Sequence, residues 1–374
     1  MKIEFYKHDI SRVDIANLNK VLKGVFLTTG ETVADFEKKL AVFLDAKHVV
    51  GLMSGTAALH LSLAYFGIGP GDEVITTPLT YTATLDAIEY LGAKPILVDV
   101  EVKTGNMNAE LIKNKITKKT KAILPVHLYG QMCDMRKIRK IADKFGLKII
   151  EDSAHCLEGE RDGVRPAQLG DIACFSFYAT KNITCGEGGA IATNIADAGE
   201  WFKKARSHGL NKDVSARYGK TYAHYDKEFL GFKCNMSNIQ AALMLDQLKR
   251  IRRQLKIRER ICQTYNQSFS KIENINLLEL VADTVSTRYL YTILVDKDRR
   301  DDIMQQLRQQ GIHTVVNYRP AHLLSYYRKK YGLKEGDFPV AEDIGSRTLS
   351  LPLYPKLTGR EIKYIIETLI KTVS

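Results

Sequence analysis

From residue 33 to about residue 200 the sequence alternates between helical and strand patterns, and this alternation constrains the fold most strongly. The stretches "VADFEKKLAVFL" and "DMRKIRKIADKFG" have helical spacing, whereas "DEVITT", "KPILVDV", "KAILPVHL" and "LKIIED" are short apolar runs typical of strands. Because each strand is almost continuously apolar, both faces of the sheet are expected to be covered. The sequence therefore predicts an α/β fold with a large, mostly parallel sheet between layers of helices.

The pattern changes after residue 200. A long helix is predicted from about Ser237 to Ser270. It is followed by strand "YLYTILVD", helix "DDIMQQLRQQG", strand "HTVV", strand "TLSLPL" and a last helix from Thr358. These elements indicate a small C-terminal α+β domain. We expect a large domain over residues 1–250 and a small one over 251–374, with the boundary between 245 and 275.

The chain is basic, with 55 Lys and Arg residues against 43 Asp and Glu residues and a net charge of +12. This excess is typical either of a solvated surface or of attraction to an anionic partner, such as a phosphorylated substrate, nucleic acid or an acidic membrane. The densest run, "LKRIRRQLKIRERI", has helical spacing and is predicted to be the exposed face of the long helix. No stretch is basic enough to indicate a nucleic-acid-binding arm.

The cysteines and the N-terminal sequence favour a cytoplasmic protein. Six scattered cysteines form no CxxC pair, so neither a metal site nor a disulfide framework is expected, and free thiols suit a reducing compartment. The first residues, "MKIEFYKHDI", lack the apolar core of a signal peptide, and no apolar run has the length of a membrane span.

In open α/β sheets, ligands bind at the carboxyl ends of the strands. Polar residues occur at three positions of this kind in the predicted sheet. Ser54, Gly55 and Thr56 precede a helix, so they either bind a phosphate or simply cap that helix. Asp152 lies at the end of an apolar strand, where it fits either a ligand-binding acid or the cap of a short helix. Lys181 follows the strand "IACFSFYA" and precedes glycines 186, 188 and 189; alone it also fits a surface loop.

Together, these three features are the parts that hold pyridoxal phosphate. A lysine forms a Schiff base with the aldehyde of this cofactor. An acid pairs with the pyridinium nitrogen, which makes the ring an electron sink. A helix N-terminus holds the phosphate. The order of phosphate turn, acid and lysine therefore predicts a pyridoxal-phosphate site.

Longer motifs place the chain in a known family. The segments "SGTAALH", "GDEVITTPLTYTAT", "VHLYGQ", "EDSAH", "FSFYATKNITCGEGG" and "NMSNIQAALMLDQL" occur in the family's order, from "TTGETVADFEKKLAVFL" to "RTLSLPLYPKLT". The chain resembles the DegT/DnrJ-type sugar aminotransferases over nearly its whole length. The resemblance implies the fold-type I pyridoxal-phosphate architecture and a homodimer with shared active sites.

The resemblance also assigns residues around the cofactor ring. It makes Lys181 the Schiff-base lysine, whose free amine then moves the proton between the cofactor and the amino-bearing carbon. Asp152 pairs with the pyridine nitrogen, and His155 lies beside the ring near its hydroxyl. Tyr81 stacks on the ring, whereas its residue type alone also fits a core aromatic.

Four further residues are assigned to the cofactor phosphate by the resemblance. Thr56 and Ala57 contact it from the turn before the helix, and Ser176 contacts it from the strand before the lysine. Asn235 reaches the phosphate of the neighbouring subunit; without the family, it also fits an N-cap of the long helix.

One region departs from the family pattern, in which a His-Tyr pair often precedes "xPLH". Here the stretch is "VNYRPAHLLSYYR", with Asn317 in the histidine place. Tyr318, Arg319 and His322 are the expected substrate contacts, and Arg319 is suited to a bidentate pair with a phosphate. The departure leaves the identity of the substrate open.

The expected function is transfer of an amino group from glutamate, which leaves as 2-oxoglutarate, to a nucleotide-linked keto sugar. The motif "FSFYATKNIT" most resembles that of family members that aminate carbon 4 of the sugar. Two alternatives remain: a pyridoxal-phosphate sugar dehydratase on this fold, and a non-catalytic regulatory protein that kept the fold. Lys181 argues against the dehydratase, because that branch has histidine there. The intact set of Lys181, Asp152 and Thr56 argues against the regulatory protein.

Overall fold

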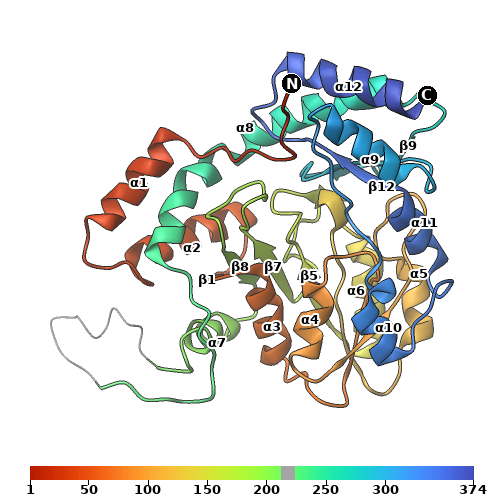
Figure 1. The fold of residues 1–374 in the computed structure, drawn as a ribbon. Coiled ribbons are helices and arrows are strands. Elements are labelled where there is room, and N and C mark those ends of the chain that lie inside the picture. The colour runs from red at the N-terminus through yellow and green to blue at the C-terminus, as the bar shows by residue number, and fades with distance from the viewer. Residues whose placement is uncertain (212–223) are drawn as a thin grey trace.

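A seven-stranded sheet forms the centre of the computed structural model, which describes residues 1–211 and 224–374 (Figure 1). The strand order is β1-β8-β7-β5-β4-β2-β3. The strands are β1 His48–Leu52, β2 Glu73–Thr76, β3 Lys94–Leu97, β4 Thr120–Ile123, β5 Lys148–Asp152, β7 Ile172–Ser176 and β8 Gly189–Thr193. Strand β8 is antiparallel to β1 and β7, and the other neighbours pair in parallel. The predicted large, mostly parallel sheet is confirmed.

Helices cover both faces of this sheet because side chains alternate along each strand. On β7, Ile172 and Cys174 belong to one core and Ala173 and Phe175 to the opposite core. The first core is closed by α3 Gly55–Tyr65, α4 Ala83–Glu89 and α7 Ala198–Ala205. The opposite face is closed by α2 Glu31–Leu44, α5 Ala109–Ile112, α6 Met135–Phe145 and the first half of α8 Asn238–Phe269.

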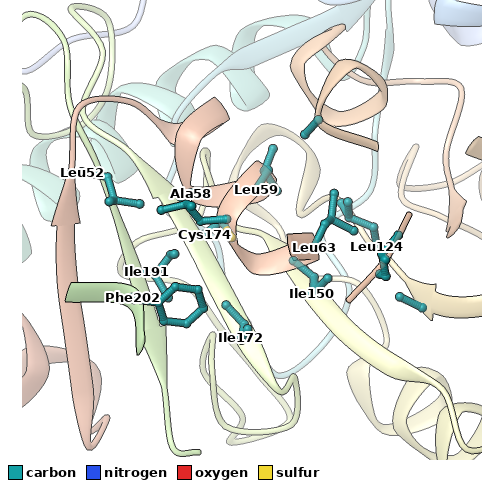
Figure 2. Packing of buried hydrophobic residues seen from close by; sticks show 14 of the residues in the cluster. Leu52, Ala58, Leu59, Leu63, Leu124, Ile150, Ile172, Cys174, Ile191 and Phe202 are labelled. Atoms are coloured by element: carbon teal, nitrogen blue, oxygen red, sulfur yellow. The ribbon is translucent and has the colours of Figure 1, made fainter. Parts of the chain in front are cut away.

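Figure 2 shows the first core at close range. Ala58 and Leu63 of α3 lie over the strands and face Cys174 and Ile150. All four side chains are at most 1% exposed. This contact fixes α3 on the sheet, and the N-terminus of α3 is the predicted phosphate turn.

The long helix α8 passes from the large sheet to a second core. Its first half contributes residues such as Met244 and Ile251 to the sheet core, and its second half contributes Tyr265 and Phe269 to the other. Ser237 caps the helix through a capping box with Gln240. The alternative that Asn235 is the N-cap is therefore wrong.

The second core surrounds a three-stranded sheet of order β12-β11-β9. Its elements are β9 Asn276–Leu277, β11 Tyr291–Leu294, β12 Thr348–Leu351, α9 Arg300–Gln309 and α12 Gly359–Val373. Ile3 packs into this core from the opposite end of the chain, and both termini lie near α12 (Figure 1). The division of the chain at residues 250 and 251 stays a prediction.

Some elements differ from the prediction. "HTVV" is not a strand, because within it only Val315 pairs, in a single bridge to Ser350. The sequence patterns did not predict α1 Arg12–Leu22, β1, α7, β9, α10 Ser325–Tyr331, α11 Pro339–Arg347 or the pair β6 Glu160–Arg161 and β10 Thr284–Val285. Short 3₁₀ turns lie at Lys113–Lys115, Leu128–Gly130 and Ala321–Leu323. Within the described residues, no helix has the length and apolar character needed to cross a membrane.

Candidate active site

The strand register brings the predicted site segments to one edge of the sheet. Leu52 at the end of β1 pairs with Gly189 of β8, and Gly189 also pairs with Ser176 at the end of β7. Asp152 at the end of β5 pairs with Cys174, two residues before Ser176. The turn before α3, the acid and the strand before Lys181 therefore lie side by side at this edge.

The N-terminus of α3 offers free backbone donors at this edge. Ser54 is the N-cap, and its Oγ accepts the N–H of Ala57 at 3.1 Å. The N–H groups of Gly55 and Thr56 have no partner among the described residues. Because these donors sit at the positive end of a helix dipole, they are suited to bind an anion, with Thr56 a better donor than the already bonded Ala57.

Two glycines allow this turn to lie directly on the sheet. A Cβ on Gly189 would lie 2.3 Å from the carbonyl carbon and oxygen of Ser54 and 2.6 Å from Gly55 N. A Cβ on Gly55 would lie 2.9 Å from Ser176 Cβ. The close approach places Ser176 beside the free N–H groups, where its hydroxyl can serve the same anion.

Asp152 is a buried acid whose carboxylate is held by two donors. Oδ2 accepts from Thr84 Oγ1 at 2.8 Å and Oδ1 accepts from Ala154 N at 3.2 Å. Burial raises the pKa of Asp152, whereas the two hydrogen bonds and the charge of Lys181 lower it. The bond to Ala154 closes a turn and no helix follows, so Asp152 is not a helix cap.

Lys181 lies in the loop between β7 and β8, in a cavity that His155 and Ser176 also line. Its Nζ lies 4.3 Å from the ring centroid of Tyr289, a cation–π distance. Gly186 has φ 88° in this loop, which favours glycine. The loop therefore presents the amine at the same edge as the acid and the phosphate turn.

His155 is neutral and has a defined tautomer. Burial, followed by the charge of Lys181, holds the pKa of His155 well below its usual range. Nδ1 accepts the N–H of Tyr129 at 3.3 Å, so the ring proton is on Nε2, which lies 3.1 Å from the hydroxyl of Tyr318. The ring of His155 also packs on Tyr289, with centroids 4.3 Å apart.

Tyr81 and Asn235 lie at the rim of this region. Tyr81 is 63% exposed, so it is not a core aromatic, and its ring centroid lies 6.1 Å from that of Tyr318. Asn235 pairs with Leu52 near the phosphate turn of its own chain, but its Nδ2 donates to Thr29 Oγ1 at 2.6 Å. Neither side chain is among those lining the cavity around Lys181.

Of the expected substrate contacts, Arg319 is exposed, Tyr318 is half-buried with its hydroxyl 3.1 Å from His155 Nε2, and His322 is buried. Arg319 is exposed, and among the described residues its guanidinium donates only to Leu323 O, at 3.4 Å. His322 is 0% exposed, lies 2.9 Å from Glu342 Oε1 and packs on Phe338. The assignment of His322 to substrate is not supported, since a wholly buried, paired imidazole cannot reach a ligand here.

Thr84 and Tyr289 are site residues that the sequence reasoning missed. Thr84 ends the quoted run "GDEVITTPLTYTAT" but lies in α4, well past the end of β2, so the rule that polar residues follow strand ends did not point to it. Tyr289 follows Lys181 by more than a hundred residues, and no local pattern marks it. In the described parts of the chain, no group of three or more His, Cys, Asp and Glu side chains is arranged to hold a metal ion.

Comparisons with known proteins identify the family of the chain. The model of the DegT/DnrJ/EryC1/StrS aminotransferase family matches residues 8–370. The spore coat polysaccharide biosynthesis protein SpsC of Bacillus subtilis is 38% identical over 96% of this chain and 94% of its own. GDP-perosamine synthase of Caulobacter vibrioides is 37% identical over 91% of this chain and 90% of its own. The PLP-form of Spr1654 from Streptococcus pneumoniae superposes with a TM-score of 0.93 at 32% identity, covering 100% of this chain and 99% of its own.

The hydrogen bond from Thr84 to Asp152 generates a pH-dependent prediction. Because folding raises the pKa of Asp152, ionising this group costs stability as the pH rises above 3.8 through the folded value. Thr84→Val removes a donor to the charged form and should raise this pKa further. We expect its deficit in unfolding free energy to be smallest in acid and to reach about 1.5–3 kcal/mol at neutral pH.

Urea unfolding of both proteins at several pH values measures this deficit. Thr84→Ser keeps the hydroxyl and serves as the control, with a deficit that does not grow with pH. A Thr84→Val deficit that is constant from acid to neutral pH would show that the hydroxyl does not stabilise the ionised carboxylate.

Proposed function

The chain belongs to the DegT/DnrJ/EryC1/StrS aminotransferase family, and from this membership we propose that it transfers an amino group from glutamate to carbon 4 of a nucleotide-linked keto sugar. The cofactor of this aminotransferase is pyridoxal 5'-phosphate, as the PLP-form of Spr1654 implies. The observation that carries the proposal is the meeting of a phosphate turn, Asp152 and Lys181 at one sheet edge.

The residues at this edge fit the cofactor chemically. When bound, pyridoxal phosphate supplies an aldehyde that combines with amines and a ring that withdraws electrons from the carbon being aminated. Gly55 and Thr56 offer two free N–H groups to its phosphate, and the close approach of this turn to Gly189 puts Ser176 beside them. Lys181 provides the one amine in the adjoining cavity.

Asp152 supplies a negative charge where a protonated ring nitrogen needs one. Burial alone disfavours that charge, but the donors Thr84 and Ala154 both bind the ionised carboxylate. The acid is therefore held in place before any ligand arrives, so little reorganisation is needed.

Lys181 and His155 differ in what they do with protons. Lys181 is assigned to bind the cofactor and, once free, to carry a proton at Nζ. His155 keeps its proton on Nε2, because Nδ1 accepts from Tyr129. A neutral His155 packed on Tyr289 presents a flat, uncharged surface, so it positions a ring without competing for protons.

For the substrate, we assign the diphosphate of the nucleotide sugar to the loop that carries Tyr318 and Arg319. The guanidinium of Arg319 is exposed and almost uncommitted, which suits bidentate binding of a phosphate. The overall exchange converts glutamate and keto sugar into 2-oxoglutarate and amino sugar. The amino sugar would serve surface polysaccharide, lipid or glycan synthesis in the cytoplasm, a compartment that suits six free thiols.

We further propose a homodimer that shares its two sites. Apolar side chains beside the phosphate turn are exposed, including Met53 at 47% and Tyr81 at 63%. A second copy of the chain would cover them and bring its Asn235 to the phosphate of the first. This arrangement explains why Asn235 lies outside the cavity of its own Lys181.

Cofactor binding by Lys181 is tested by absorbance. The purified protein should be yellow with pyridoxal phosphate, borohydride should bleach the band, and Lys181→Ala should lose it because the amine is gone. Asp152→Asn should keep the band but turn over very slowly, which separates binding from chemistry. A wild-type protein that takes up no pyridoxal phosphate would refute the assignment.

The substrate is tested by an amination screen of nucleotide-linked 3-keto and 4-keto sugars with glutamate, read by mass. We expect a 4-keto sugar to be aminated by the wild type and not by Lys181→Ala. Amination only of 3-keto sugars would contradict the carbon 4 assignment. Failure of all keto sugars together with success of a keto-cyclitol would change the substrate class.

Shared sites are tested by mixing two inactive variants, Asn235→Ala and Lys181→Ala. If Asn235 acts on the neighbouring subunit, one site of a mixed dimer carries both lesions and the other carries none. Activity should then partly recover. Absence of recovery, with subunit exchange demonstrated, would mean that Asn235 does not act across the interface.

A further inference from the structure

The residues on either side of Lys181 are both bonded to one distant segment, Thr287–Tyr289. The hydroxyls of Thr180 and Tyr289 lie 3.0 Å apart, and Asn182 Nδ2 donates to Thr287 O at 3.2 Å. Lys181 itself lies over the ring of Tyr289. The position of the lysine backbone therefore depends on where this segment is held.

A buried ion pair holds this segment. Glu158 follows His155 by three residues, and Arg258 lies in the middle of α8; their side chains are 2% and 3% exposed. Arg258 pairs with Glu158 Oε1 and donates through Nε to Thr287 O at 3.1 Å. Asn182 Nδ2 donates to Glu158 Oε1 at 3.1 Å as well as to Thr287 O. Two oxygens thus each accept from both Asn182 and Arg258.

Burying both charges of this pair opposes the stability gained from their attraction. Burial raises the pKa of Glu158 and lowers that of Arg258, so each charge is unfavourable where it lies. Glu158 Oε2 is buried without a hydrogen-bond partner among the described residues. Buried pairs of this kind can often be replaced by apolar residues without loss of stability, so stability alone does not account for them.

We propose that Glu158 and Arg258 are positioning residues for Lys181, acting through Asn182 and the Thr287–Tyr289 segment. This inference rests on the proposed function, since it assigns the pair to the alignment of the cofactor-binding amine. Arg258 lies on α8 between Ile251 of the sheet core and Ile261 of the second core. The pair therefore ties the helix that joins the two cores to the loop that carries the lysine.

A double-mutant cycle between Glu158 and Asn182 tests this path. Glu158→Gln keeps an acceptor but leaves the charge of Arg258 without a counter-ion, and Asn182→Ala cuts the link while leaving the ion pair. Each should raise the dissociation constant of pyridoxal phosphate about tenfold, or 1.4 kcal/mol. Each should also shift the pH midpoint of the cofactor absorbance band, measured without substrate. The double variant should be no worse than either single variant, because both changes interrupt one path.

The matched control is Glu37→Gln, which breaks a comparable buried pair between Glu37 of α2 and Arg206 at the end of α7; both side chains bond to the backbone of Gly51 in the edge strand β1. It should lower Tm as Glu158→Gln does, while leaving the dissociation constant and the pH midpoint unchanged. If Glu158→Gln does not fold, the apolar double variant Glu158→Leu/Arg258→Met replaces it in the cycle.

Wild-type values in Glu158→Gln, or full additivity with Asn182→Ala, would overturn the proposal. Equal shifts in the Glu37→Gln control would also overturn it, because they would reflect general loss of stability. Failure of the wild type to bind pyridoxal phosphate would instead refute the proposed function.

Discussion

The contact between Gly189 and the backbone of Ser54 and Gly55 is the constraint on which the site depends. A single methyl group on Gly189 would lie 2.3 Å from Ser54, so the turn can approach the sheet only because residue 189 has no side chain. This approach sets Ser176 beside the free N–H groups of α3. It also fixes the distance between α3 and the sheet, and side chains of α3 close one core of the sheet (Figure 2). Anion binding and core packing therefore share one contact.

The electrostatics of the edge follow from burial and its compensation. Burial raises the pKa of Asp152, but two donors and the nearby charge of Lys181 oppose that effect. His155 has no comparable compensation, and Lys181 acts against its protonation, so it stays neutral. In this buried environment, hydrogen bonds support the charged form of Asp152, whereas His155 stays uncharged. Their different hydrogen-bond partners set this difference.

The sequence predicted what local patterns encode. The ends of the main strands and the starts of α8 near Ser237 and α12 near Thr358 follow from periodicity and neighbouring residues, and the structure agrees. It could not predict contacts between distant segments. Tyr289 reaches Lys181 only through the fold, and His322, which matches a family position, is buried against Glu342. The short strand β1 was missed because its five residues include Gly51, which weakens a strand pattern.

The glycines after Lys181 have structural roles that their spacing in the sequence does not reveal. Gly189 leaves room for the protein's own backbone, and Gly186 provides a left-handed turn. Space for a ligand arises instead on the other side of the lysine, between His155, Ser176 and Tyr289. Gly186 and Gly189 therefore shape this site through the backbone, by bringing strands, turn and loop to the distances that the chemistry requires.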